Sequence, residues 1–139
     1  MQITRFSDYS LRVLMYLSVH SDGLSNIANI ATSFNISKNH LVKVVHHLAK
    51  TGLIDSVRGR SGGIRLAQRP EEIRIGNVVR QSEQTLEIVD CHKPACPLLP
   101  SCKLKRVLNE AKQAFYQVLD EYTLADISQN KKLLLRLIA

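Results

Sequence analysis

The sequence predicts a mainly α-helical fold, in which a winged helix-turn-helix domain is followed by a long C-terminal helix. Apolar residues recur at helical spacing over most of the 139 residues. In the first half, three helical stretches precede two short alternating stretches around a glycine-rich loop, which is the order of a winged helix-turn-helix. Aromatic residues make up only 5% of the chain and there is no Trp, so the core must consist of Leu, Ile, Val and Ala.

Two helices are expected in the first part of the chain. The first spans residues 7–20, where a Ser-Asp pair provides the N-cap and an amphipathic run follows. The second lies within residues 23–37, with Ser25 as its N-cap and an end near Asn35.

A third helix is expected at residues 37–52. Ser37 is its N-cap and Gly52 occupies its C-cap position. Its apolar face consists of Leu41, Val44, Val45 and Leu48. Only about three residues separate it from the preceding helix, and so tight a turn is typical of helix-turn-helix units.

The periodicity then changes from helical to β-like. Residues 53–57 and 64–67 alternate, and the loop RGRSGG between them completes a hairpin, the expected wing. A short helix is expected at residues 69–83, behind Pro70 and two acidic residues.

Residues 103–122 form the long C-terminal helix. One continuous apolar stripe runs along it, formed by Leu104, Val107, Leu108, Ala111, Phe115, Val118, Leu119 and Tyr122. A small domain does not easily cover a stripe of this length, so we expect it to pack against a second copy in a homodimer. The alternative is a helix folded back on its own domain. The tail after residue 122 should add one or two helical turns.

Positive charge is concentrated in the first half. Residues 1–70 contain nine Lys and Arg against three Asp and Glu, whereas the second half is nearly balanced. This asymmetry favours a module that binds a polyanion such as double-stranded DNA, and the alternative is a merely soluble basic surface.

The third helix and the wing carry the candidate DNA-binding residues. Recognition helices present their first turn to base edges, and Asn reads adenine while Lys reads guanine or phosphate. Arginines on a wing suit the narrow minor groove of A·T-rich DNA. The candidates are Ser37, Lys38, Asn39, His40 and Lys43 in the helix, and Arg58, Arg60 and Ser61 in the wing. Taken alone, the helical set also fits an ordinary polar helix start.

The motifs of common enzymes are missing from the sequence. It contains no G-x-S-x-G, H-E-x-x-H, G-x-G-x-x-G or phosphate-binding loop, so we expect no enzyme activity. The adjacent His46 and His47 point about 100° apart on a helix and do not form a metal pair. The longest apolar run near the start is too short to span a bilayer, and we expect a cytoplasmic protein without membrane contact.

The stretch DCHKPACPLLPSC holds all three cysteines, Cys91, Cys96 and Cys102, with three prolines among them. Cytosolic cysteines are metal ligands or reactive thiols more often than structural disulfides. The spacing is looser than that of zinc knuckles and closer to iron–sulfur ligation. Zinc, with His92 as a fourth ligand, a redox disulfide and free thiols stay open as alternatives.

Taken together, these stretches resemble the bacterial family of winged-helix, iron–sulfur-dependent repressors over the whole chain. The matching segments are DYSLRVLMYL, ISKNHLVKVVHHLAKTGLI, VRGRSGGIRLA, IRIGNVV, the cysteine loop and YTLADI. Within the family, regulators of cluster assembly have more widely spaced cysteines and a His shortly after the third. Here Cys102 is followed by KLKR, so the chain is more similar to the nitric-oxide-sensing repressors.

The resemblance implies a DNA-binding domain (1–82), a cluster-binding loop (83–102) and a dimerisation helix with its tail (103–139). It implies a 2Fe-2S or 4Fe-4S cluster held by the three cysteines and by Asp8 of the other subunit. From the residues alone, Asp8 would instead form an i,i+4 ion pair with Arg12. We interpret these as two states of a switch, with Arg12 as the partner of the released Asp8.

The resemblance further implies a homodimeric repressor that leaves its operator DNA when nitric oxide attacks the cluster, so that nitric-oxide detoxification genes are expressed. The alternatives are a sensor of iron–sulfur or iron status with the same fold, or a zinc or thiol-redox regulator.

Overall fold

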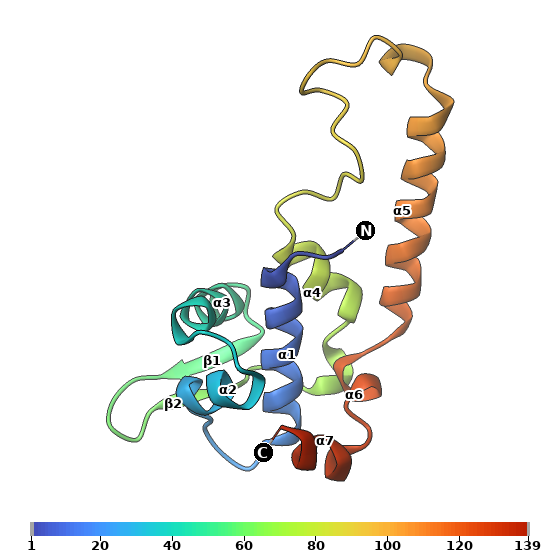
Figure 1. Ribbon diagram of the computed structural model, residues 1–139. Coiled ribbons are helices and arrows are strands. Elements are labelled where there is room, and N and C mark those ends of the chain that lie inside the picture. The colour runs from blue at the N-terminus through green and yellow to red at the C-terminus, as the bar shows by residue number, and fades with distance from the viewer. Residues whose placement is uncertain (1, 139) are drawn as a thin grey trace.

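The computed structural model describes residues 2–138 and confirms the predicted winged helix-turn-helix and long C-terminal helix (Figure 1). Helix α1 (Arg5–Val19) lies at the centre and packs against α2 (Ile27–Phe34) and α3 (Lys38–Lys50). Strands β1 (Ile54–Val57) and β2 (Gly63–Leu66) form an antiparallel hairpin in which Ile54 lies opposite Leu66. Together these elements form the winged helix-turn-helix domain that the sequence pattern predicts.

Two helix starts differ from the predictions. Helix α1 begins at Arg5 with Thr4 as its N-cap, two residues before the expected start. Helix α2 is capped by Asn26 rather than Ser25, because the backbone of Ser25 exchanges hydrogen bonds with Ile64 of the wing, at 2.8 and 2.9 Å. Long-range pairing thus takes Ser25 out of the cap that the local sequence suggested.

The helix expected at 69–83 is divided into two elements. A 3-10 turn at Pro70–Glu72 is followed by α4 (Ile75–Ser82). The extended backbone between them pairs with the segment after the long helix: Leu124 N donates to Ile73 O at 2.8 Å and Ile75 N donates to Tyr122 O at 3.0 Å. This pairing interrupts the helix.

The long helix α5 (Lys103–Glu121) confirms the element expected at 103–122. Two short helices, α6 (Leu124–Ile127) and α7 (Lys131–Leu137), then return the chain to α1. Figure 1 shows α7 beside the lower end of α1, while the first turns of α5 extend away from the rest of the molecule. The tail therefore contributes to the core rather than extending the arm.

One hydrophobic core lies among α1, α3, the hairpin and α4. Its members come from both ends of the chain, since Leu124 and Ile138 lie in the same cluster as the apolar faces of α1 and α3. The fully enclosed side chains include Leu14, Ile30, Leu41, Leu48 and Ile64. A core of this composition fixes the orientation of α3 and of the wing.

Candidate nucleic-acid interface and cysteine loop

Helix α3 is held by its apolar face and by the turn before it. Leu41, Val44, Val45 and Leu48 are buried, as their spacing predicted. Asn35 adopts the left-handed conformation (φ 51°), and Ile36 N donates to Ala31 O at 2.9 Å, which closes the turn within three residues. Ser37 caps α3 as predicted, because its Oγ accepts the amide of His40 at 3.3 Å. The first turn of α3 is therefore fixed relative to the core.

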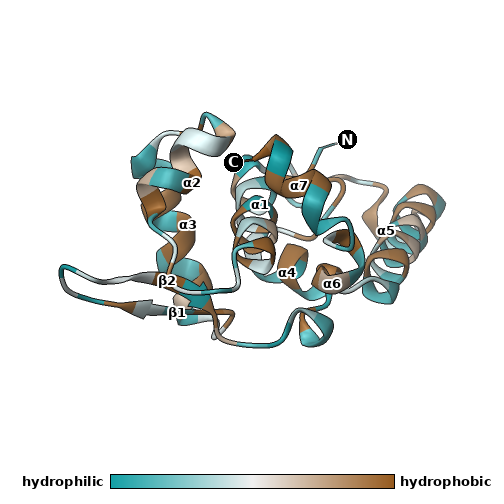
Figure 2. Cartoon of the chain, turned by 90° about the horizontal axis from the view of Figure 1, so that it is seen from below, coloured by the Kyte–Doolittle hydropathy of each residue, from teal (hydrophilic) through white to brown (hydrophobic). Residues whose placement is uncertain are grey.

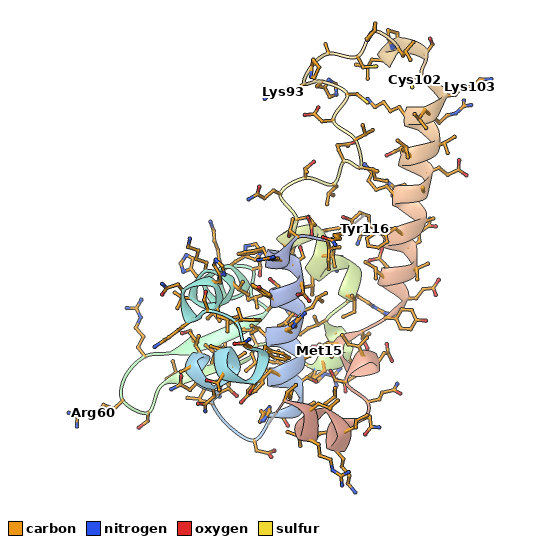
Figure 3. The ribbon with its side chains drawn as sticks, viewed as in Figure 1. Met15, Arg60, Lys93, Cys102, Lys103 and Tyr116 are labelled. Carbon is orange, nitrogen blue, oxygen red and sulfur yellow. The ribbon has the colours of Figure 1, made fainter. Side chains whose placement is uncertain are left out.

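The predicted DNA-binding residues belong to the N-cap and first turns of α3 and to the loop of the wing. Their side chains are all exposed: Ser37, Lys38, Asn39, His40, Lys43, Arg58, Arg60 and Ser61. The His40 ring also lies 6.3 Å from the ring of Tyr9 on α1. Figure 3 shows Arg60 at the tip of the hairpin, pointing away from the body of the molecule.

The glycines of the wing allow its backbone to turn sharply. Gly59 has a φ of 113°, a conformation that side chains rarely adopt. A Cβ on Gly62 would overlap the carbonyl oxygen of Val57. These two positions therefore require glycine, and the turn presents Arg58 and Arg60 on its outside.

The cations on this surface are not neutralised by the protein. Within residues 2–138, Lys38, Lys43, Arg58 and Arg60 take part in none of the ion pairs. The nearest ion pair in the wing joins Arg65 to Asp55, at 3.5 Å. Free cations on a helix start and an adjacent wing are suited to phosphate contacts.

The cysteine loop lies at the opposite end of the molecule, beside the start of α5 (Figures 1 and 3). All three cysteines are free thiols and half-buried. Cys96 N donates to Cys91 O at 3.0 Å, which brings these two residues into one turn. Cys102 is the N-cap of α5, and its Sγ accepts the amide of Lys105 at 3.4 Å.

The loop also has a hollow next to Cys102. Its volume is about 480 Å³, and Lys103, Lys105 and Arg106 of α5 contribute to its walls. Within residues 2–138, no three His, Cys, Asp or Glu side chains converge on a point where they could hold a metal ion. The single chain therefore brings the three thiols to one loop but does not gather them into a complete coordination sphere.

The thiols fit a soft metal group in their chemistry. Three unpaired cysteines on one loop offer the donors that iron–sulfur groups use, and an amide donated to sulfur, as at Cys102, tunes such groups. The basic residues of α5 would offset the charge of the thiolates. Within residues 2–138 the structure gathers no fourth donor beside them.

Asp8 lies in the first turn of α1 and forms the predicted ion pair with Arg12. Arg12 Nε donates to Asp8 Oδ1 at 2.9 Å, and both side chains are more than one-third exposed. An exposed i,i+4 pair contributes only about 0.3–0.5 kcal/mol. Asp8 is therefore held weakly by its own chain.

The same turn of α1 is tied to the root of the cysteine loop through Glu83, a connection that the sequence analysis missed. Glu83 Oε1 accepts hydrogen bonds from Thr4 N at 2.7 Å, Thr4 Oγ1 at 3.1 Å and Ser7 Oγ at 2.6 Å. Ser7 was expected to cap α1, but its hydroxyl is used in this contact. The residues are more than seventy positions apart, so local pattern gives no signal for them.

A second missed contact joins α4 to α5. Arg80 donates two hydrogen bonds of 2.6 Å to the carboxylate of Asp120, and its guanidinium lies over the Tyr116 ring at 4.5 Å. The hydrogen bond from Arg80 lowers the pKa of Asp120. A Cβ on Gly76 would collide with the Asp120 carboxylate, so glycine is needed for this pair to form.

No helix within residues 2–138 has the length and apolar character needed to cross a membrane.

Comparisons with known proteins place the chain among bacterial regulators. The sequence profile of the Rrf2 family, described as iron-dependent transcriptional regulators, matches residues 3–130. The HTH-type transcriptional regulator NsrR of Bacillus subtilis is 49% identical, over 99% of this chain and 97% of the relative. NsrR of Halalkalibacterium halodurans is 52% identical, over 94% of this chain and 92% of the relative.

Solved structures agree with the fold. The T. potens IscR structure superposes with a TM-score of 0.76 at 27% identity, covering 94% of this chain and 88% of that one. CymR, the global cysteine regulator of B. subtilis, superposes with a TM-score of 0.73 at 27% identity, covering 93% of this chain and 97% of that one.

Proposed function

Because this chain belongs to the Rrf2 family of iron-dependent transcriptional regulators, we propose that it represses transcription as a homodimer and releases its operator in response to nitric oxide. It is a transcriptional regulator rather than an enzyme, and the predicted similarity to NsrR is confirmed by relatives close to 50% identical over nearly the whole chain. DNA as the partner implies a cytoplasmic location.

The DNA-binding part of the proposal is supported by the surface formed by α3 and the wing. In this proposal Asn39 reads a base edge, while Lys38, Lys43 and the wing arginines contact phosphates or the minor groove, and all of these side chains are exposed. Ser37 caps the helix and turns the amide end of α3 toward a phosphate. The proposed DNA-binding surface also includes His40 of α3 and Ser61 of the wing.

The homodimer is supported by the exposed stripe of α5. Leu104, Val107 and Val118 are exposed large side chains on this helix, and Tyr122 at its C-cap is exposed as well. An uncovered apolar stripe of this length is the usual mark of an interface between proteins. We propose that the equivalent helix of a second copy covers it, which places two α3 helices on one side for two half-sites of an operator.

In the proposed sensing site, Cys91, Cys96 and Cys102 hold an iron–sulfur cluster, 2Fe-2S or 4Fe-4S, and Asp8 of the second copy provides the fourth ligand. When bound, the cluster supplies iron that reacts with nitric oxide. The carboxylate is a harder and weaker partner for iron than a thiolate, so Asp8 is the ligand most easily displaced.

Asp8 and Arg12 then act as the switch in the chain itself. The weak ion pair between them gives way when Asp8 binds metal and re-forms when Asp8 is released. The first turn of α1 also contacts α3, because the Phe6 ring lies 5.3 Å from that of His47. A change at Asp8 therefore reaches the helix that reads DNA, and a small rotation of the two α3 helices disturbs their half-site spacing.

The observation that carries the sensing proposal is that three free thiols lie on one loop and that one of them, Cys102, accepts a hydrogen bond from a backbone amide. A sensor of iron–sulfur or iron status is the second candidate, since the same ligands would serve it. A zinc or thiol-redox regulator is the third. The anaerobic absorption spectrum with iron and sulfide counts separates these, because a zinc protein is colourless.

The test uses anaerobically purified protein, an operator duplex selected from random DNA, and stepwise addition of nitric oxide. We expect the visible absorbance and the operator affinity to fall together. The Cys96→Ser variant should lack the absorbance and bind DNA only non-specifically, whereas the control Ser101→Ala on the same loop should behave as wild type. Unchanged operator affinity after loss of the absorbance contradicts the proposal.

Arg12→Gln tests the switch separately. This variant should keep the cluster and operator binding, because Arg12 is not a ligand. Nitric oxide should still bleach the absorbance, but DNA should be released less completely, because Asp8 has lost its alternative partner. Full release at the wild-type dose argues against Arg12 as the switch partner.

A further inference from the structure

We propose that Val42 determines sequence specificity by reading the methyl group of a thymine in the major groove. This inference rests on the proposed DNA-binding function and adds an apolar contact to the polar residues that the sequence pattern singled out. Thymine is the base that presents an apolar group there, in its C5-methyl.

The first support is the placement of Val42 on α3. Its side chain is 46% exposed, although the opposite face of the helix is buried in the core. Of residues 38–50, all within the described chain, Val42 is the only large apolar side chain that is exposed. A single exposed apolar residue is ordinary on a protein surface, so a binding role for Val42 has to be argued from the residues around it.

The neighbours of Val42 on the helix surface are polar, and one of them, Asn39, belongs to the proposed DNA-binding residues. Asn39 lies three positions before it and His46 four positions after it, and residues at these spacings are adjacent on a helix surface. Both are exposed, and α3 contains no acidic residue. Val42 therefore lies in the middle of a cationic and polar strip, where a protein partner with an apolar surface is disfavoured and DNA is favoured.

The second support is the shape of the side chain. Val has one strongly preferred rotamer in a helix, so the two methyl groups of Val42 lose little entropy when they contact a base. Lys43 and the wing arginines, free of ion pairs within residues 2–138, can hold the backbone of the DNA while Val42 faces the base edges. Figure 2 shows α3 and the hairpin on the side of the molecule away from α5, so dimerisation through α5 leaves Val42 accessible.

The experiment replaces thymine by deoxyuracil, which removes only the methyl group. The anaerobically purified full chain first selects a duplex from random-sequence DNA. Each thymine is then replaced in turn, and the dissociation constant is measured by fluorescence anisotropy. We expect one sensitive thymine in each half-site, with affinity lowered about threefold to tenfold by the loss of its methyl group.

The Val42→Ala variant completes a double-mutant cycle. It should bind the thymine duplex more weakly by a similar factor and should no longer distinguish thymine from uracil at the sensitive position. Its circular dichroism and dimer state should match wild type, because Val42 is not among the buried residues of α3. The control Lys43→Ala should lower the salt slope by about one while keeping the uracil sensitivity.

Several results overturn the inference. A wild-type protein with no methyl-sensitive thymine contradicts it, as does a Val42→Ala variant that retains the full uracil penalty. A Val42→Ala variant that loses affinity because it no longer dimerises shows that a second copy covers this residue. If the wild-type protein selects no sequence at all, the proposed function fails together with the inference.

Discussion

The winged helix-turn-helix part and the cysteine loop differ in what fixes their positions. In α1, α3 and α4, each helix has a buried apolar stripe, and several side chains are fully enclosed. From residue 83 to residue 115, no residue is buried, although this span includes all three cysteines and most of α5. The first region is positioned by its own core, whereas the second has no core of its own.

This difference assigns separate tasks to the two regions. Under the proposed function, a part whose packing is complete can keep the DNA-reading residues of α3 in place whether or not a ligand is bound. A part without buried residues can rearrange at small cost when a metal group or a second copy binds, because it has few packing contacts to lose. The proposed function therefore places regulation in the part of the chain that has no buried residues.

Truncating one leucine in each region gives the largest expected contrast. Leu48 is fully buried in α3, and Leu48→Ala should lower the free energy of unfolding by about 2–5 kcal/mol. Leu98 in the cysteine loop is 66% exposed, and Leu98→Ala should change the free energy of unfolding by less than about 0.5 kcal/mol. Urea unfolding measures both, and equal losses would show that the loop has a core of its own.

A charge placed on the α5 stripe tests whether the second region is completed by another copy. Val107 is 57% exposed, and Val107→Asp should shift the protein toward monomer and reduce operator affinity at least about tenfold, since a buried carboxylate is costly. Gln113→Asp adds the same charge on α5 away from the stripe and is the control. Sedimentation velocity reports the change, and a Val107→Asp dimer as tight as wild type rules out this interface.

The contact that joins α4 to the end of α5, and so anchors the helix that follows the cysteine loop, can be loosened at Gly76. In Gly76→Ala the new methyl group displaces the Asp120 carboxylate from Arg80, so we expect a loss of about 1–3 kcal/mol in unfolding free energy. Gly23→Ala is the control, because nothing lies within 4 Å of its added Cβ. Thermal unfolding that is unchanged in Gly76→Ala would mean that the Arg80–Asp120 pair adjusts without cost.

The smallest effect is expected from the pH dependence of the same contact. The pKa of Asp120 is lowered in the folded state by the hydrogen bond from Arg80. Its stabilising effect is therefore complete above the unfolded pKa, about 3.9, and is lost as the pH falls through the lower folded pKa. Wild type should exceed Asp120→Asn in stability at pH 7, and the difference should shrink below about pH 4. Urea titrations across this range measure it, and a constant difference contradicts the assignment.

The same contrast explains what sequence reasoning could predict. The apolar faces of α3 and the glycine-bearing wing follow from local periodicity, and the structure confirms them. The start of α2 was predicted wrongly because Ser25 pairs with Ile64, almost forty residues later. The break between Glu72 and Ile75 depends on Tyr122 and Leu124 in the same way. The predicted helix bounds were wrong where the backbone forms hydrogen bonds with residues far away in the sequence instead of with its neighbours.

The candidate site was predictable to a similar degree. Spacing and composition identified the three cysteines and the basic face of α3, and helical spacing identified the Asp8–Arg12 pair. The contacts of Glu83 and Asp120 were missed, because each joins elements that only the tertiary structure brings together. The role of Asp8 as a ligand is a prediction that depends on the family resemblance and not on spacing.

Glu83 also has a consequence for how such a regulator can diversify. One carboxylate at the root of the loop receives three hydrogen bonds from the opening turn of α1. Beyond that anchor, insertions or exchanged residues in the loop leave those three donors undisturbed. The tip of the loop can therefore change in sequence while one carboxylate keeps the loop joined to the start of the chain.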